Sequence, residues 1–171
     1  IANEELAKAF KEKYNLSSIG LRYFNVYGPR MDIYGVYTEV MIRWLDNIDK
    51  GESPIIFGNG KQSMDFVYVE DVAKSNILAL KSNINEGIYN VGTGKETSLN
   101  GIIKEMLKLT NSNLKPTYKD KKGQIIVSRR RADIKKAKKE LGFEAKIDLS
   151  SGLKKLMEWR KKQKNEKSWN P

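Results

Sequence analysis

Short apolar segments alternate with longer amphipathic segments along most of this chain, and that order restricts the folds open to it. The short segments have the composition of strands, and the longer ones repeat apolar residues at the spacing of a helix with one buried face. Strands are predicted at Ser18–Asn25, Pro54–Phe57, Asp65–Val69, Gly87–Val91, near Pro116 and at Ile125–Val127. Helices are predicted at Ala2–Tyr14, Thr38–Lys50, Val72–Lys81, Leu99–Leu109, Asp133–Leu141 and Leu149–Lys161. Such an order is typical of an α/β fold.

Two glycine pairs follow predicted strands, in Gly58–Asn59–Gly60 and Gly92–Thr93–Gly94. Neither has the three-glycine pattern, between a strand and a helix, that cradles a dinucleotide pyrophosphate. We interpret both as turns. The chain by itself is therefore not expected to hold a dinucleotide.

Polar residues precede two of the predicted helices and can accept hydrogen bonds from the free N–H groups of a first helical turn. Glu70–Asp71 precedes the helix expected from Val72, and Thr97 or Ser98 precedes the one expected from Leu99. We expect these residues to cap the two helices.

The composition excludes several classes of site. The 171 residues include no cysteine and no histidine. Thiolate chemistry, disulfides, histidine-based zinc sites and serine–histidine triads are therefore excluded, and acid–base work must use Asp, Glu, Lys or Tyr. No apolar run approaches the roughly 18–20 residues that span a bilayer, and no signal peptide is visible. We expect a cytoplasmic protein with no membrane segment.

The positive charge is concentrated near the end of the chain. Residues 119–171 carry 18 basic and 7 acidic side chains, an excess that equals the net charge of +11. A solvated helix face accounts for such runs, and a polyphosphate ligand would need only one or two of the arginines. A nucleic-acid surface would interleave aromatic residues for stacking, and only Trp159 and Trp169 are available. A nucleic-acid partner is therefore not favoured.

Five motifs in order resemble a known family. They are Leu21–Arg30 (LRYFNVYGPR), Ile56–Gly60 (IFGNG), Asp65–Ala73 (DFVYVEDVA), Tyr89–Gly92 (YNVG) and Ala132–Ala137 (ADIKKA). Together they resemble the nucleotide-sugar epimerase and dehydratase branch of the extended short-chain dehydrogenase/reductases, and within it the UDP-glucose 4-epimerase group. The resemblance runs from Ile1 to about Trp159.

The resemblance implies the C-terminal part of a Rossmann-type doubly wound sheet plus a small α/β substrate-binding domain. Residues 1–30 would be the end of the incomplete NAD-binding half. Residues 31–163 would be a mixed region that contains the sugar-nucleotide-binding domain, and residues 164–171 would be a polar tail. The helix at Ala2–Tyr14 has no preceding strand or cap, so we interpret the chain as a piece of a longer protein. The resemblance places the glycine-rich NAD loop and the catalytic Tyr-x-x-x-Lys pair in a missing N-terminal half, which would be this chain's partner, and implies a homodimeric parent.

The resemblance also implies the site residues. Tyr23 and Phe24 would line the nicotinamide of NAD, and Asn25 would donate to the diphosphate of the sugar nucleotide; closing a turn is the alternative for Asn25. The remaining implied contacts are to phosphate, by Thr38, Glu39 and Val40 at a helix start, and to uridine, by Ile55, Ile56 and Phe57. A plain cap at Thr38 and an ordinary buried strand are the alternatives for these two segments.

Two positions depart from the family pattern. Many relatives have an arginine directly before Asp-Phe that binds the diphosphate, and this chain has Met64 there. We expect Arg129, Arg130 or Arg131 to supply the missing cation, with Arg129 first because it lies nearest the end of the predicted strand Ile125–Val127, and Arg130 next. The usual Gly-Asp reads Gly123–Gln124, which removes an expected ribose contact.

The function implied is NAD-dependent epimerisation of a UDP-sugar at C4 through a 4-keto intermediate, with this chain supplying the substrate side. A 4,6-dehydratase or decarboxylase on the same scaffold is the alternative within enzymes. A basic, non-catalytic nucleic-acid-binding module is the alternative from another class. The chain alone is expected to be inactive and to retain no NAD, because the NAD loop and the tyrosine base are not in it.

Overall fold

The computed structural model describes residues 2–33, 40–120 and 128–167. Within these ranges the helices are α1 (Ala2–Tyr14), α2 (Val40–Asp49), α3 (Val69–Lys81), α4 (Leu99–Leu109), α5 (Lys135–Leu141) and α6 (Leu149–Lys167). The strands are β1 (Ser18–Tyr23), β2 (Asn25–Tyr27), β3 (Ile55–Phe57), β4 (Ser63–Met64), β5 (Phe66–Tyr68), β6 (Glu86–Val91), β7 (Thr97–Ser98), β8 (Thr117–Lys119) and β9 (Arg129–Arg130).

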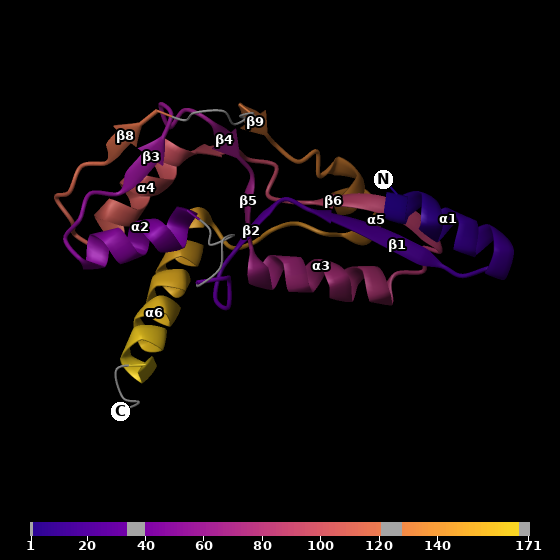
Figure 1. The fold of residues 1–171 in the computed structure, drawn as a ribbon. Helices are drawn as coiled ribbons and strands as arrows, with labels where there is room; N and C mark the ends of the chain where they lie inside the picture. The colour runs from indigo at the N-terminus through magenta and orange to yellow at the C-terminus, as the bar shows by residue number, and fades with distance from the viewer. Residues whose placement is uncertain (1, 34–39, 121–127, 168–171) are drawn as a thin grey trace.

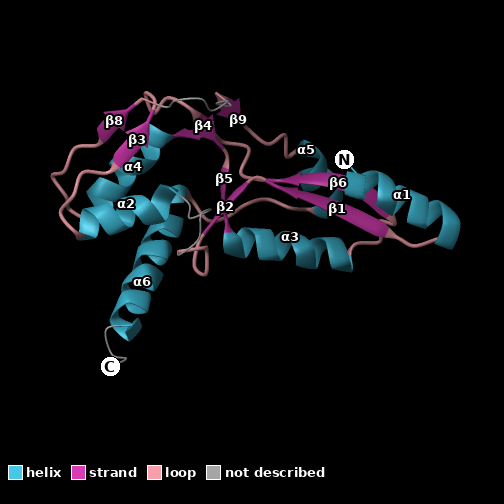
Figure 2. Cartoon of the chain, viewed as in Figure 1, coloured by secondary structure: helices cyan, strands magenta, loops and turns pink. Residues whose placement is uncertain are grey.

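The elements form two parts that lie side by side (Figure 1). One part, which we call the sheet layer, consists of α1, β1, α3, β6 and α5. The other, which we call the helical lobe, consists of α2, α4 and α6 with the short strands β3, β4, β7, β8 and β9. Strands β2 and β5 connect the two parts, as the colouring by secondary structure makes clear (Figure 2).

In the sheet layer, β1 and β6 pair in parallel along their whole length. Successive side chains of a strand point to opposite faces of the sheet. Arg22 of β1 donates from Nε and Nη2 to the Glu4 carboxylate of α1 (2.7 and 2.6 Å), whereas the hydroxyl of Tyr23 donates to Asn76 Oδ1 of α3 (2.8 Å). Helices α1 and α3 therefore cover opposite faces of the β1–β6 pair.

The apolar core of the sheet layer lies on the α3 side. Its buried members are Val67, Val72, Tyr89, Val91, Ala137, Leu141 and Phe143. Helix α1, on the other face, buries none of its residues. A hollow of about 620 Å³ separates α1 from the floor formed by β1 and β6. The α3 face of the sheet is thus closed and the α1 face is only partly covered.

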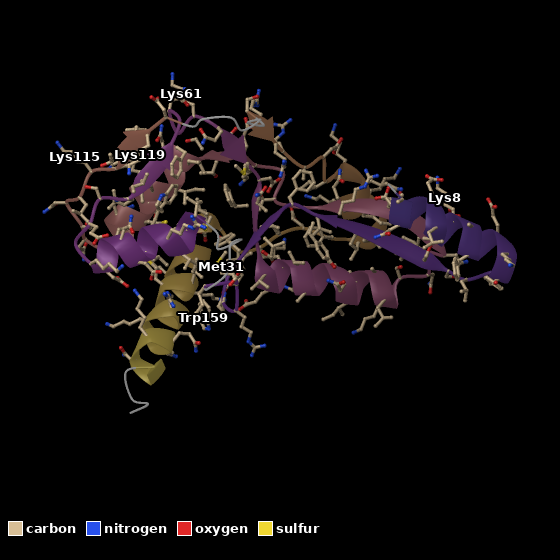
Figure 3. The ribbon with its side chains drawn as sticks, viewed as in Figure 1. Lys8, Met31, Lys61, Lys115, Lys119 and Trp159 are labelled. Atoms are coloured by element: carbon tan, nitrogen blue, oxygen red, sulfur yellow. The ribbon has the colours of Figure 1, made fainter. Side chains whose placement is uncertain are left out.

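The helical lobe has its own core between α2, α4 and α6. Its largest fully buried side chains include Trp44, Ile102, Met106, Leu153 and Leu156. Strand β3 pairs in parallel with β8, and β4 lies between β7 and β9. Met31 and Trp159, both partly buried, pack against this core where the lobe meets the chain that follows β2 (Figure 3).

A charged contact joins α6 to α2. The Arg160 guanidinium donates to both carboxylate oxygens of Asp46 (2.9 and 3.1 Å), and Lys164 lies 2.9 Å from the same carboxylate. Burial raises the pKa of Asp46, but the hydrogen bonds from Lys164 and Arg160 outweigh it, so the pKa lies below its ordinary value. On α6, Arg160 lies one helical turn after Leu156, which is part of the apolar core of the lobe.

Most predicted elements are present at or near the predicted bounds, and helix α4 begins and ends where the sequence predicts. Ser98 caps it, because its Oγ accepts from the N–H of Gly101 (3.1 Å). The strand predicted at Ser18–Asn25 is divided into β1 and β2 at Phe24, where the chain changes partner from β6 to β5. The predicted strand at Ile125–Val127 lies outside the described residues.

The predicted cap of α3 is wrong. The helix begins at Val69, so Glu70 and Asp71 stand inside its first turn, and the residue before the helix, Tyr68, makes no side-chain cap. Asp71 is buried instead, and its Oδ2 accepts from the N–H groups of Lys146 (3.0 Å) and Ile147 (2.9 Å). The acidic residue fixes the segment before α6, a contact that the local sequence does not indicate.

Both glycine turns are confirmed. Gly58 and Gly60 adopt positive φ, and a Cβ at Gly60 would lie 2.1 Å from the side chain of Asn100. Gly94 also adopts positive φ. None of the helices in the described ranges combines the length and apolar composition needed to span a membrane. Acidic side chains in the same ranges form no group of three that could hold a metal ion.

Candidate functional site

The candidate site lies where the carboxyl ends of β1 and β6 meet the helical lobe. In open α/β sheets, ligands bind in the crevice beyond the carboxyl ends of the strands. β1 ends at Tyr23 and leads into Phe24 and Asn25, and β6 ends at Val91 and leads into the turn that starts at Gly92. These two connections bring the predicted site residues of the Leu21–Arg30 motif next to the turn that follows β6.

Hydrogen bonds to Asp65 hold together the chain segments that form this site. Its side chain is fully buried. Oδ1 accepts from the N–H (2.8 Å) and hydroxyl (2.6 Å) of Thr93, and Oδ2 accepts from the N–H groups of Gly94 (2.8 Å) and Ala132 (3.2 Å). Four donors satisfy a buried carboxylate. A Cβ at Gly92 would lie 2.9 Å from Asp65 Oδ2, so glycine lets the turn approach this closely.

Asn25 carries a buried polar atom without a partner. Its backbone N–H donates to the carbonyl of Asp65 (3.0 Å), which fixes the residue at the start of β2. Its side-chain Oδ1 is buried and has no hydrogen-bond partner among the described residues. An unsatisfied buried group costs about 1–3 kcal/mol, and a ligand donor can remove that cost. A half-turn of the amide would present the Nδ2 donor at the same place.

The predicted nicotinamide pair, Tyr23 and Phe24, occupies two different environments. The Tyr23 ring is 47% exposed and is held on the α3 side by its bond to Asn76. Phe24 is half-buried, and its N–H donates to the carbonyl of Val91 (3.0 Å). The structure therefore places Phe24 beside Asn25 at the strand end, with Tyr23 turned toward the helix.

Strand β3 holds the three predicted uridine residues. Ile55 is half-buried, Ile56 is buried in the lobe core, and the Phe57 side chain is 48% exposed. The carbonyl of Ile55 accepts from Trp44 Nε1 (2.8 Å), and that of Phe57 accepts from Gln62 Nε2 (3.1 Å). Of the three side chains, only the Phe57 ring is open enough for a base to pack on it.

The strand that pairs with β3 places a lysine opposite Phe57. Lys119 of β8 stands opposite Phe57 in the parallel ladder, and Tyr118 is half-exposed next to it. Lys61 and Lys115 lie on the same end of the helical lobe (Figure 3). An exposed aromatic ring on one strand, with a lysine opposite it on the next, suits a nucleobase with an attached phosphate. The sequence pattern did not single out Lys119, because its position opposite Phe57 depends on the β3–β8 pairing.

Arg129 is engaged in an ion pair with Glu96. Its Nε donates to Glu96 Oε2 (3.0 Å), its Nη2 contacts Oε1, and the hydroxyl of Ser63 donates to Oε2 as well (3.1 Å). The Arg129 hydrogen bond holds the pKa of Glu96 below its ordinary value, and Glu96 raises the pKa of the Arg129 guanidinium. A phosphate would have to compete with Glu96 for this arginine.

Arg130 is placed differently from its neighbour. It stands opposite Met64 in the β4–β9 ladder, and opposite residues in adjacent strands share a face of the sheet. Arg130 is exposed and forms no hydrogen bond or ion pair with the residues that the structure describes. Met64 is half-buried and packs against the lobe core. A guanidinium is therefore available beside residue 64.

The remaining predicted phosphate contacts are only partly covered by the structure. Val40 begins α2, is half-buried and packs against the lobe core. Thr38 and Glu39 lie outside the described residues, and so does the Gly123–Gln124 departure.

Comparison with protein-family models decides the classification. The model of the NAD dependent epimerase/dehydratase family matches residues 1–92, more than half of the chain. The chain belongs to this family.

Two curated relatives of this family member have names that state a UDP-linked sugar. A putative UDP-glucose 4-epimerase of Methanocaldococcus jannaschii is 42% identical over 92% of this chain, and a UDP-glucuronate 4-epimerase of Thermodesulfobacterium geofontis is 36% identical over 92%. The matches cover 50% and 47% of those two proteins. The chain thus spans about half the length of the curated relatives it matches.

Solved structures of the family share the fold. The UDP-glucose 4-epimerase of Thermotoga maritima, determined with UDP-glucose, has a TM-score of 0.86 at 38% identity, over 95% of this chain and 52% of its own. A UDP-N-acetylglucosamine 4-epimerase of Methanobrevibacter ruminantium has a TM-score of 0.87 at 35% identity, with the same coverage. The predicted fold class, part of a Rossmann-type α/β protein, is confirmed.

In this epimerase-family chain Tyr27 is a structural residue. It is buried, packs edge-on against the Tyr68 ring at 5.5 Å, and approaches the carbonyl of Leu149 (3.5 Å). Burial, and next the charge of Asp148, raises the pKa of Tyr27 above its ordinary value. A hydroxyl so placed cannot serve as a base at neutral pH.

Sequence reasoning missed the role of Asp65. The pattern predicts Asp65 as the first position of a strand, whereas the hydrogen bonds that its carboxylate accepts come from segments up to 28 and 67 residues away along the chain. The available signal was an acidic residue directly before the apolar run Phe66–Tyr68, since Asp is rarely fully buried unless it is paired.

Proposed function

We propose that this chain is the substrate-binding part of an NAD-dependent UDP-sugar epimerase that inverts C4 through a 4-keto intermediate. The observation that carries the proposal is the unpaired, buried Oδ1 of Asn25 at the carboxyl end of the sheet. It marks a polar position prepared for a ligand, in a family member whose named relatives use UDP-sugars.

We assign three groups to the nucleotide. With its amide turned so that Nδ2 takes the place of Oδ1, Asn25 donates to the diphosphate. The guanidinium of Arg130, which stands beside Met64 and has no partner among the described residues, neutralises it. Arg129 remains a second candidate, weakened by its pair with Glu96. The exposed ring of Phe57 packs against uridine, with Ile55 and Ile56 fixing its strand. Thr38, Glu39 and Val40 remain candidates for a phosphate at the start of α2.

The described residues fit only one end of NAD. Tyr23 and Phe24, at the carboxyl end of β1, can border the nicotinamide, whereas the two glycine turns are occupied by contacts of their own with Asn100 and Asp65. When bound, NAD supplies the acceptor for the C4 hydride and its donor on return. Phe24 would orient the ring. We assign the proton transfers to a tyrosine of the parent outside this chain, and Tyr27, which is buried, takes no part in them.

Calorimetric titration of the chain with UDP tests the nucleotide assignment. We expect one site per chain, competition between UDP and UDP-glucose for it, and binding of ADP that is at least about tenfold weaker, because the base is read by the β3 segment. Equal binding of ADP and UDP would contradict the uridine assignment. Failure of all these nucleotides to bind would overturn the proposed function.

A decarboxylase is the second candidate. A UDP-N-acetyl-alpha-D-glucosaminuronate decarboxylase of Bacillus cytotoxicus is 29% identical over 85% of this chain. The two reactions differ in their products, so the parent enzyme should be incubated with UDP-glucose and with UDP-glucuronate. Release of carbon dioxide from the second sugar would support the decarboxylase, and a C4 epimer from either sugar would support the epimerase.

A further inference from the structure

The first turn of α4 is bonded to the turn between β3 and β4. The N–H of Leu99 donates to the carbonyl of Gln62 (3.1 Å), and the N–H of Asn100 donates to the carbonyl of Gly60 (3.1 Å). The first N–H groups of a helix can bind an anion when they are free. In this chain two of them are occupied by carbonyls of the chain itself. The start of α4 therefore holds the turn that leaves β3.

The side chain of Asn100 adds two hydrogen bonds in the same region. Its Nδ2 donates to the carbonyl of Asn59 in the turn (3.0 Å), and its Oδ1 accepts from the hydroxyl of Tyr118 on β8 (3.1 Å). Glycine at position 60 leaves room for this amide, because a Cβ at Gly60 would lie 2.1 Å from Asn100 Oδ1. One side chain therefore joins the β3–β4 turn, helix α4 and strand β8.

Strand β8 determines what stands beside the ring that we assign to uridine. Among the described residues β3 pairs with β8 alone, with Ile56 opposite Tyr118 and Phe57 opposite Lys119. Opposite residues of two strands share a face, and neighbours along a strand lie on opposite faces. Tyr118 thus lies on the face of the buried Ile56, toward α4. Phe57 and Lys119 are both exposed and share the other face.

The ladder between β3 and β8 is short and needs support from outside. It pairs three residues of each strand, and beyond its end the N–H of Gly58 donates to the carbonyl of Lys119 (2.9 Å). A two-stranded ladder of this length is at best marginally stable by itself in water. The bond from Tyr118 to Asn100 attaches β8 to α4, a helix of the lobe core.

We propose that Asn100 is a positioning residue that determines how this chain selects a nucleobase. Its amide fixes β8 relative to the turn that leaves β3, and so keeps the Phe57 ring and Lys119 together on one face. Asn100 acts from the opposite face and does not contact the base itself. The inference rests on the proposed function, because that function places uridine on Phe57.

Calorimetric titration with UDP and with ADP tests the inference. Asn100→Ala removes both side-chain bonds but keeps the backbone bond to Gly60, so the lobe should still fold. UDP binding should weaken about fivefold or more, and ADP binding should change by less than about twofold, because only the pyrimidine is held by the β3 segment. An unchanged ratio of the two affinities, whether neither falls or both fall equally, would overturn the inference.

A second variant isolates the bond to β8. Tyr118→Phe keeps the ring and removes only the hydroxyl, at a half-exposed position. It should lower the ratio of UDP to ADP affinity about two- to threefold, and it should add little to Asn100→Ala, because both variants lose the same bond. Fully additive effects of the two substitutions would contradict the inference.

The matched control lies at the other end of the same helix. The hydroxyl of Thr110 donates to the carbonyl of Met106 (2.9 Å), and Thr110→Val removes it. This variant should leave the ratio of UDP to ADP affinity unchanged. A fall of the ratio as large as in Tyr118→Phe would show that any weakened contact of α4 has this effect, and would contradict the inference.

Amide hydrogen exchange measures the support of β8 without a nucleotide. The amide of Gly58, which donates to Lys119, should exchange faster in Asn100→Ala than in the wild type, and the amide of Met106 should not. Equal exchange of Gly58 in the two proteins would overturn the inference. A wild type without preference for UDP would reject the proposed base site and the inference together. A wild type that prefers UDP, with variants that keep the preference, would reject the inference alone.

Discussion

At the scale of single residues, two adjacent arginines should differ in their effect on nucleotide binding. Arg130 has no partner among the described residues and stands beside Met64, whereas Arg129 is paired with Glu96. A charge-assisted contact to phosphate is of the strong kind. Arg130→Ala should weaken UDP binding about tenfold or more, and Arg129→Ala should weaken it less. Calorimetry with UDP measures both, with Lys139→Ala as the control; a larger effect at Arg129 would reverse the assignment.

Asn25 should show opposite effects on stability and binding. Its buried Oδ1 has no partner, so Asn25→Ala removes an unsatisfied group, and the free energy of unfolding should stay the same or rise by about 1 kcal/mol. UDP binding should fall at least about fivefold, because the ligand loses its contact. Asn90→Ala is the matched control, since Asn90 donates to the carbonyl of Asp133 (3.1 Å) and that substitution can only destabilise. A clear loss of stability in Asn25→Ala would show that the amide is structural.

The hydrogen-bond partners of the buried carboxylate of Asp65 could not be predicted from the sequence. The sequence indicated Asn25 through its motif, but it gave no sign that Asp65 binds Thr93, Gly94 and Ala132, because those partners are distant along the chain. Replacement of Asp65 by Asn puts an amide nitrogen against N–H donors. We expect a loss of about 2–4 kcal/mol in unfolding free energy by urea denaturation. A loss below about 0.5 kcal/mol would mean that the loops are held by other contacts.

At the scale of elements, the contact between α2 and α6 should depend on pH. Asp46 has a lowered pKa in the folded chain, so its contribution to stability is present above the unfolded value near pH 4 and is lost as the pH falls through the folded value. At pH 7, Asp46→Asn should cost about 1–2 kcal/mol, reduced by partial solvent exposure. The difference from the wild type should vanish in acid.

The control for this contact is Glu144→Gln. Glu144 pairs with Lys138 and Lys146 at an exposed site, where ion pairs are weak. Thermal unfolding across pH 2.5–7 therefore should show a small change for Glu144 and a pH-dependent one for Asp46. A penalty for Asp46→Asn that persists unchanged at the acid end would show that packing, and not charge, holds α6.

Elements with strong periodicity were predictable, and their junctions were not. The apolar spacing of Leu99–Leu109 and the hydroxyl of Ser98 fix helix α4 locally. The break at Phe24 and the early start of α3 at Val69 arise from partners far along the chain: β6 and β5 for the strand, and the Asp71 contact with residues 146 and 147 for the helix. A local pattern has no access to such partners.

At the scale of the whole molecule, the two parts differ in how fully they bury their apolar side chains. The helical lobe closes around Trp44 and Met106, whereas the sheet layer exposes Leu6, Phe10 and Leu80. The alternation of strands and helices predicted an α/β fold, since each element carries its own pattern. The clustering of exposed apolar side chains could not be predicted from the sequence, because burial depends on what covers α1 and α3.

The charge of the whole chain separates the two classes of partner. With a net charge of +11, the chain will attract any polyanion at low salt. A nucleic-acid site that contacts about 6–10 phosphates would lose roughly 10³–10⁵ in affinity between 50 and 200 mM salt. UDP offers one diphosphate and a base that packs on Phe57, so its affinity should fall by less than about tenfold over the same range. Parallel titrations with UDP and with a single-stranded oligonucleotide measure both slopes. A steep slope for the oligonucleotide together with no UDP binding would favour the nucleic-acid module. The sugar-nucleotide site requires the opposite result: at 200 mM salt UDP still binds and the oligonucleotide is displaced.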